Sequence, residues 1–199
     1  MTKIKICGLM REEDALFAAE HGADFLGMIF VRESPRCIDV ERAKAIRRAV
    51  SGTPAKLVGV FRDRQPGEVR DVAVRAGLDF VQLHGSETDA DVVAIGVPTF
   101  KTIVIGDTLP DTAAHPHAEW ILFDSGSGGT GQRFDWSLLA GFDRRKPFLL
   151  AGGLNPDNVG AAISLVRPDA IDLASGVESA PGIKDHEKIE RLIERVRRA

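Results

Sequence analysis

Short apolar runs alternate with longer amphipathic segments along the whole chain, and this alternation constrains the fold more than any other feature. Short runs rich in branched and aromatic residues are typical of buried strands, whereas apolar residues three and four positions apart are typical of helices. The predicted strands are Ile4–Cys7, Phe25–Phe30, Leu57–Phe61, Phe80–Leu83, Thr99–Ile105, Trp120–Phe123, Phe148–Ala151 and Ala170–Leu173. The predicted helices are Glu12–His21, Val40–Val50, Gly67–Ala76, Thr88–Ile95, Trp136–Phe142, Pro156–Val166 and Lys184–Arg198, with a weak candidate between Pro110 and His115.

Eight apolar strands joined through helices favour a parallel sheet that is covered on both faces or closed on itself. A closed (β/α)8 barrel uses all the predicted units, and barrels of this kind have a typical length of ~250 residues. We therefore predict an α/β fold with one small (β/α)8 barrel domain over residues 1–199, in which some crossovers are short or irregular. An open doubly wound sheet is the alternative, because a strand count does not prove closure.

The composition narrows the class of partner. Hydrophobic residues make up 44% of the chain, and its charges nearly cancel to a net −3, which favours neither nucleic acid nor a membrane surface as partner. No signal peptide and no apolar segment of ~20 residues is present, so we expect a cytoplasmic protein with a small-molecule ligand. Cys7 and Cys37 are expected to be reduced thiols.

Chemically useful residues follow the predicted strands. In a barrel the active site forms at the C-terminal ends of the strands, so these residues converge in space. They include a thiol at Cys7, a guanidinium at Arg36, an imidazole at His84 and a carboxylate at Asp124. Each also has a purely structural interpretation: a small buried hydrophobe for Cys7, a surface side chain for Arg36, and a backbone-bonded histidine for His84.

Glycine-rich loops follow the last three predicted strands. They contain Gly128 and Gly129, Gly152 and Gly153, and Ser175 and Gly176. Glycine lets backbone N–H groups approach an anion closely, and barrels commonly bind phosphate in the loops after the seventh and eighth strands. We therefore predict a phosphate site here, although glycines that only form tight turns would give the same pattern.

Four other residues receive structural interpretations. Asp135 is expected to be a helix N-cap, and Asn155 and Pro156 are expected to be an N-cap and the first residue of a helix. Cys37 has no polar cluster of its own and is expected to be structural.

From Lys5 to Asp185 the chain resembles the phosphoribosylanthranilate isomerase family of tryptophan biosynthesis. The matching segments are Lys5–Gly8, Ser34–Arg36, Val81–Gly85, Phe123–Asp124, Gly128–Gly131, Phe134–Trp136, Ala151–Val159, Ser175–Glu178 and Pro181–Asp185. Their order and spacing together make the resemblance specific.

The resemblance implies a (β/α)8 barrel that works without a cofactor. No metal is expected, because no close-spaced pair of ligands supports a metal site. The reaction would be the Amadori rearrangement of N-(5-phosphoribosyl)anthranilate to 1-(2-carboxyphenylamino)-1-deoxyribulose 5-phosphate. Cys7 would be the general base, Asp124 the general acid, and Arg36 the partner of the anthranilate carboxylate. The phosphate would lie on backbone around Gly129, Gly153 and Gly176. We expect the protein to be a monomer or a homodimer.

Two residues depart from the family pattern. Ala174 stands where the family usually has serine, and Gln132 where lysine is frequent, which bears on affinity more than on reaction type. Three alternatives stay open at this point. They are a related phosphate-binding barrel, such as indole-glycerol-phosphate synthase or a histidine-pathway sugar isomerase, a non-catalytic phosphosugar-binding barrel, and a metal site made by Cys7, His84 and Asp124.

Overall fold

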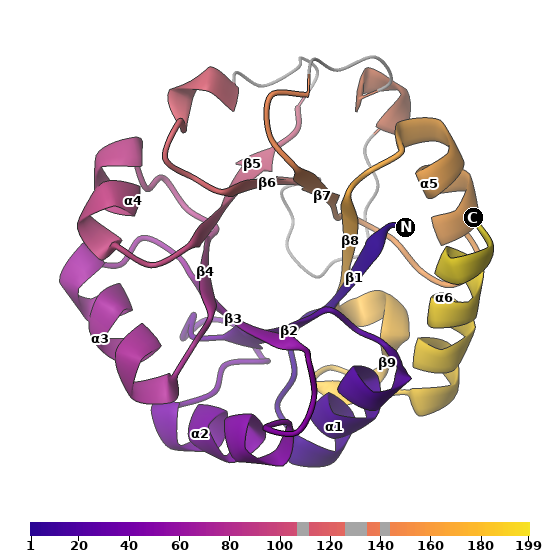
Figure 1. Cartoon of the computed structure of the whole chain (residues 1–199), viewed down its shortest axis with the longest axis horizontal. Coiled ribbons are helices and arrows are strands. Elements are labelled where there is room, and N and C mark those ends of the chain that lie inside the picture. Colours follow the sequence, from indigo (N-terminus) through magenta and orange to yellow (C-terminus); the bar gives the residue numbers. More distant parts are fainter. Residues whose placement is uncertain (107–111, 126–134, 140–143) are drawn as a thin grey trace.

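The computed structural model describes residues 1–106, 112–125, 135–139 and 144–199, which form a ring of strands with helices outside it (Figure 1). The strands are β1 (Lys3–Ile6), β2 (Phe25–Ile29), β3 (Lys56–Phe61), β4 (Phe80–Leu83), β5 (Thr99–Val104), β6 (Trp120–Asp124), β7 (Phe148–Leu150) and β8 (Ala170–Leu173). Each strand pairs in parallel with the next, and β1 pairs with β8. The predicted (β/α)8 barrel is confirmed, and the open-sheet alternative is wrong.

Four helices follow the first four strands and match their predicted positions closely. They are α1 (Glu12–His21), α2 (Val40–Ala49), α3 (Pro66–Ala76) and α4 (Asp89–Ile95). Their ends follow from local chemistry: the side chain of Asp39 accepts the N–H of Arg42 at the start of α2, and Gly77 ends α3 in the left-handed conformation that glycine adopts without strain.

The next two crossovers are irregular, as predicted. Within the described residues, only the short 3-10 helices η1 (Thr112–Ala114) and η2 (Trp136–Leu139) connect β5 to β6 and β6 to β7. Asp135 does act as a cap, because its carboxylate accepts the N–H of Ser137. Part of the helix predicted over Trp136–Phe142 lies outside the described residues.

The last two helices begin later than predicted. Helix α5 spans Val159–Val166, because Asn155 accepts the N–H groups of Asp157 and Asn158 and so closes a separate turn in front of the helix. The predictions of Asn155 as the N-cap of this helix and of Pro156 as its first residue are therefore wrong, because the N-cap is Asn158. Helix α6 spans His186–Arg198, with Asp185 as its N-cap.

An antiparallel hairpin occupies the space before α6. Its strands are β9 (Glu178–Ala180) and β10 (Ile183–Lys184), and the short helix η3 (Ser175–Val177) joins it to β8. The helix predicted from Lys184 onward missed this hairpin, because a two-residue strand has no periodicity of its own. The hairpin lies beside β1 and α1 at the edge of the ring (Figure 1).

Alternation along the strands creates two apolar cores. Residues facing outward, such as Ile4, Ile6 and Phe123, pack in the core that also contains the helices' apolar residues. Residues facing inward near the strand starts form a second cluster, in which the rings of Phe25 and Phe100 meet edge to face with centroids 5.3 Å apart. This inner cluster fills the lower barrel, so polar inward residues gather toward the strands' C-terminal ends. Across the described residues, no helix is both long and apolar enough to cross a membrane.

Candidate active site

A cavity of about 380 Å³ opens at the C-terminal ends of the strands. Six of the loops and strand ends that line it carry the predicted site residues. The predicted residues that line the cavity are Cys7, Arg36, His84, Asp124, Gly152, Gly153, Ser175 and Gly176. The structure therefore brings these residues together, whereas Gly128, Gly129 and Gln132 lie outside the described residues.

Cys7 lies directly after β1 with its side chain at the cavity. Its N–H donates to the carbonyl of Leu173 at 2.7 Å, which ties it to the end of β8. It is a free thiol and is buried. Burial raises the pKa of this thiol above its ordinary value, while the ammonium groups of Lys5 and Lys184 act in the opposite direction. The protonation of this thiol thus depends on the nearby cations.

Asp124 is the last residue of β6, and its carboxylate is paired with His84. The two side chains approach to 3.5 Å between Nε2 of His84 and Oδ2 of Asp124. The other oxygen, Oδ1, accepts the N–H of Ser125 at 2.7 Å. Burial lowers the pKa of His84, although Asp124 opposes the shift, so the imidazole is mainly neutral at neutral pH. A neutral imidazole can donate a hydrogen bond to the carboxylate and fix its orientation.

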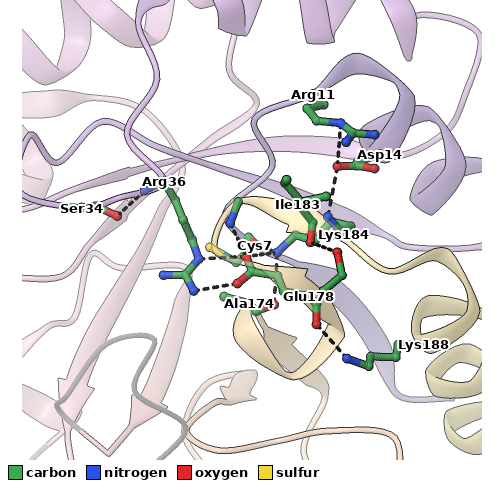
Figure 2. Close-up of polar contacts among 12 residues, drawn as sticks. Cys7, Arg11, Asp14, Ser34, Arg36, Ala174, Glu178, Ile183, Lys184 and Lys188 are labelled. Atoms are coloured by element: carbon green, nitrogen blue, oxygen red, sulfur yellow. Dashed lines mark hydrogen bonds and ion pairs between the residues drawn. The ribbon is translucent and has the colours of Figure 1, made fainter.

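Arg36 is not the solvated surface side chain of the structural interpretation. Its guanidinium is buried and forms a fork on the carboxylate of Glu178, with Nε–Oε1 at 2.8 Å and Nη2–Oε2 at 2.7 Å (Figure 2). The aliphatic part of the Arg36 side chain packs against Gly8, where an added Cβ would lie only 2.6 Å from Cδ of the arginine. Glycine after Cys7 is therefore required for this close approach.

The two described glycine loops have different structural reasons for their glycines. Gly152 and Gly153 both have positive φ angles, of 84° and 65°. Gly176 lies in η3, where an added Cβ would come within 2.0 Å of the carbonyl oxygen of Leu154. The tight packing of the loops after β7 and β8 thus requires glycine at position 176 even without a ligand. Both loops line the cavity with backbone.

A buried ion pair below Cys7 was missed by the sequence analysis. Nζ of Lys5 lies 2.9 Å from both carboxylate oxygens of Asp172 across the β1–β8 seam. Burial acts to lower the pKa of Lys5, but the Asp172 carboxylate outweighs it and holds that pKa above its ordinary value. A lysine two residues before Cys7, in a strand with a period of two, was the available signal for an inward-facing cation.

Two further buried charges, Glu178 and Lys184, were also missed as site residues. They stand in the hairpin β9–β10 rather than at the end of a barrel strand, so the rule that strand ends carry the site did not select them. Among the described residues, no group of three or more histidine, cysteine, aspartate or glutamate side chains is arranged to hold a metal ion.

Comparison with known proteins agrees with the family resemblance of the sequence motifs. Residues 4–195 match the family model described as N-(5'-phosphoribosyl)anthranilate isomerase. The N-(5'-phosphoribosyl)anthranilate isomerase of Pseudomonas aeruginosa (strain LESB58) is 41% identical over 202 residues, covering 98% of this chain and 95% of that protein.

Solved structures agree in fold over the full length. The phosphoribosyl anthranilate isomerase of Thermus thermophilus superposes with a TM-score of 0.90 at 39% identity and 99% coverage of both chains. A second such isomerase, solved in complex with reduced 1-(o-carboxyphenylamino)-1-deoxyribulose 5-phosphate, gives a TM-score of 0.88 at 37% identity and 100% coverage of both chains. The chain therefore belongs to the phosphoribosylanthranilate isomerase family, the aldose–ketose isomerases of tryptophan biosynthesis.

Proposed function

We propose that the cavity binds N-(5-phosphoribosyl)anthranilate and catalyses its Amadori rearrangement, with Cys7 as general base and Asp124 as general acid. The observation that carries this assignment is that both groups line one cavity together with the guanidinium of Arg36. The reaction needs one group to give a proton and another to take one, and it needs the anionic ends of the substrate held apart.

The first step is ring opening. Asp124 donates a proton to the ring oxygen of the ribosylamine, the bond between this oxygen and C1 breaks, and the nitrogen lone pair forms an iminium with C1. The carboxylate that remains accepts the N–H of Ser125, and Nε2 of His84 lies 3.5 Å from its other oxygen. A carboxylic acid whose conjugate base is stabilised in this way is a suitable general acid.

The second step is proton abstraction. The thiolate of Cys7 takes the proton from C2, and the electrons of that bond form the C1–C2 double bond of an enolamine while the iminium becomes neutral. The enol O–H then loses its proton and C1 gains one, which gives the ketose. Each positioned acid or base of this kind contributes typically ~10²- to 10⁴-fold in rate.

The two anionic ends of the substrate have different partners. Arg36 would hold the anthranilate carboxylate, because a guanidinium can bind a carboxylate through two parallel hydrogen bonds. The phosphate would lie on backbone N–H groups of the loops at Gly152–Gly153 and Ser175–Gly176, which line the same cavity. The related isomerase bound to a reduced carboxyphenylamino-deoxyribulose phosphate supports a ligand with these two anionic ends.

The test is direct. Purified protein is incubated with freshly prepared phosphoribosylanthranilate, and loss of the substrate's fluorescence is followed against time. Rapid loss supports the assignment, whereas no loss above the spontaneous rate would favour a phosphosugar-binding barrel without this activity. A parallel assay with the histidine-pathway aminoaldose separates the related sugar isomerase. A cytoplasmic location and assembly as a monomer or homodimer stay predictions.

A further inference from the structure

We propose that Glu178 and Lys184, in the hairpin beyond the last barrel strand, are positioning residues that orient Arg36 toward the substrate carboxylate and fix the backbone of Cys7. This inference rests on the proposed role of Arg36. Figure 2 shows the three charged side chains pointing toward one another next to Cys7.

The carboxylate of Glu178 occupies one edge of the Arg36 guanidinium. The edge formed by Nε and Nη2 is filled, and in the described part of the chain both side-chain hydrogen bonds of Arg36 go to Glu178. A guanidinium has five N–H donors, so the end formed by Nη1 and Nη2 can still bind a second carboxylate through two hydrogen bonds. Arg36 lines the cavity, which places a carboxylate ligand within its reach.

Lys184 fixes Glu178 and the Cys7 backbone at once. Its ammonium donates to Oε1 of Glu178 at 2.8 Å, to the carbonyl of Cys7 at 2.6 Å and to the carbonyl of Ala174 at 3.1 Å (Figure 2). The three N–H groups of this ammonium therefore bind three acceptors, which lie in β9, at the end of β1 and in the loop after β8. Because the N–H of Cys7 is bound to Leu173, the backbone of Cys7 is held on both sides.

The cluster of Arg36, Glu178 and Lys184 carries one more positive charge than negative charges. Arg36 and Lys184 contribute two positive charges and Glu178 one negative charge, and the side chains of these residues are at most 10% exposed. Hydrogen bonds from Arg36 and Lys184 outweigh burial and hold the pKa of Glu178 below its ordinary value, so this carboxylate is ionised at neutral pH. One buried positive charge is therefore not neutralised within the cluster, and a substrate carboxylate would stabilise it.

The experiment measures how much the ring carboxylate contributes to binding. Calorimetry gives dissociation constants for reduced 1-(o-carboxyphenylamino)-1-deoxyribulose 5-phosphate and for the same compound without the ring carboxylate. The carboxylate preference is the dissociation constant of the compound without the ring carboxylate divided by that of the compound with it. This preference should fall about 10-fold in Glu178→Gln, because the charge-assisted fork that orients Arg36 is weakened. Binding of inorganic phosphate should not change.

A matched control and a second variant keep the test decisive. Lys188→Met removes an ammonium that donates to the main-chain carbonyl of Glu178 and lies outside the cluster, so the carboxylate preference should keep its wild-type value. If Glu178→Gln does not fold, the charge-balanced double variant Glu178→Gln/Lys184→Met is used, since it leaves no unpaired ammonium buried. The same loss of preference is expected there.

The outcomes separate this inference from the proposed function. If Arg36→Met leaves the carboxylate preference intact, the role proposed for Arg36 is wrong and the positioning role is wrong with it. If Arg36→Met abolishes the preference while Glu178→Gln and the double variant retain the wild-type value, only the positioning role is overturned. A fall in both supports both.

Discussion

Lys5 and Asp172 face each other across the seam where β1 meets β8, and the lysine ammonium contacts both carboxylate oxygens at 2.9 Å. The pair closes the barrel with a buried ionic contact directly below the catalytic thiol proposed at Cys7. Lys5 is fully buried, so the pair is a place where removal of one charge leaves the other without a partner.

Lys5→Met should therefore destabilise the protein strongly. Breaking a buried pair on one side costs about 3–5 kcal/mol, measured as the free energy of unfolding in urea. The double variant Lys5→Met/Asp172→Asn should lose less than the single variant, because no charge is stranded. Lys44→Met, which removes an exposed partner of Glu41, is the matched control and should change stability by at most about 1 kcal/mol. Equal effects of Lys5→Met and Lys44→Met would contradict the argument.

Cys7→Ser and Asp124→Asn should each lower kcat at least ~100-fold, because each removes one of the two proposed proton-transfer groups. Steady-state kinetics measure the effect, and circular dichroism checks the fold. Cys37→Ser is the control for loss of a thiol elsewhere, and its turnover should stay near the wild-type value. Near-normal turnover in a folded Cys7→Ser or Asp124→Asn variant would remove that residue from the mechanism.

The reactivity of Cys7 should rise at alkaline pH. Burial raises the pKa of this thiol above its ordinary value, so the thiolate fraction should grow as pH rises. The rate of alkylation by iodoacetamide, measured against pH in a Cys37→Ser background, should have its midpoint at a higher pH than that of a free cysteine measured in parallel. Lys184→Met should move the midpoint further upward, because the ammonium favours the thiolate. A midpoint near neutral pH in the parent protein would refute the direction of the shift.

Gly153→Val should weaken phosphate binding. The φ angle of 65° at this position is strained for a branched residue, and a side chain would obstruct close approach of backbone to an anion. We expect at least ~10-fold weaker binding of inorganic phosphate by calorimetry, about the effect of losing one charge-assisted hydrogen bond. Gly52→Val, at a site where an added Cβ meets nothing within 4 Å, is the control. Unchanged phosphate affinity in a folded Gly153→Val variant would move the phosphate site elsewhere.

Activity should survive exhaustive treatment with EDTA, because every proposed step is a proton transfer between the substrate and a side chain. Turnover before and after chelation, with substrate in metal-free buffer, measures this. Activity that disappears and returns only on addition of zinc would restore the hypothesis of a metal site at Cys7, His84 and Asp124.

The sequence alone determined the barrel and most of the cavity. A strand is specified mainly by its own residues, so a short apolar run such as Trp120–Phe123 can be recognised in the sequence. The parallel arrangement of the strands then brings the residues after each run to one end of the barrel. Cys7, Arg36, His84 and Asp124 were found in this way, and all four line the cavity. The boundaries of α5 and α6 were less well predicted, since they depend on which turn Asn155 and Asp185 close.

Only the tertiary structure decided which charges meet. Arg36 and Glu178 are 142 positions apart, and Lys5 and Asp172 are 167 apart, so no local pattern relates them. Their pairing depends on the register between β1 and β8 and on a hairpin too short to have a sequence signature. The protonation of Cys7 likewise depends on burial and on the distance to cations of other elements. Local residue patterns determine the elements, whereas burial and charge pairing are properties of the packed barrel.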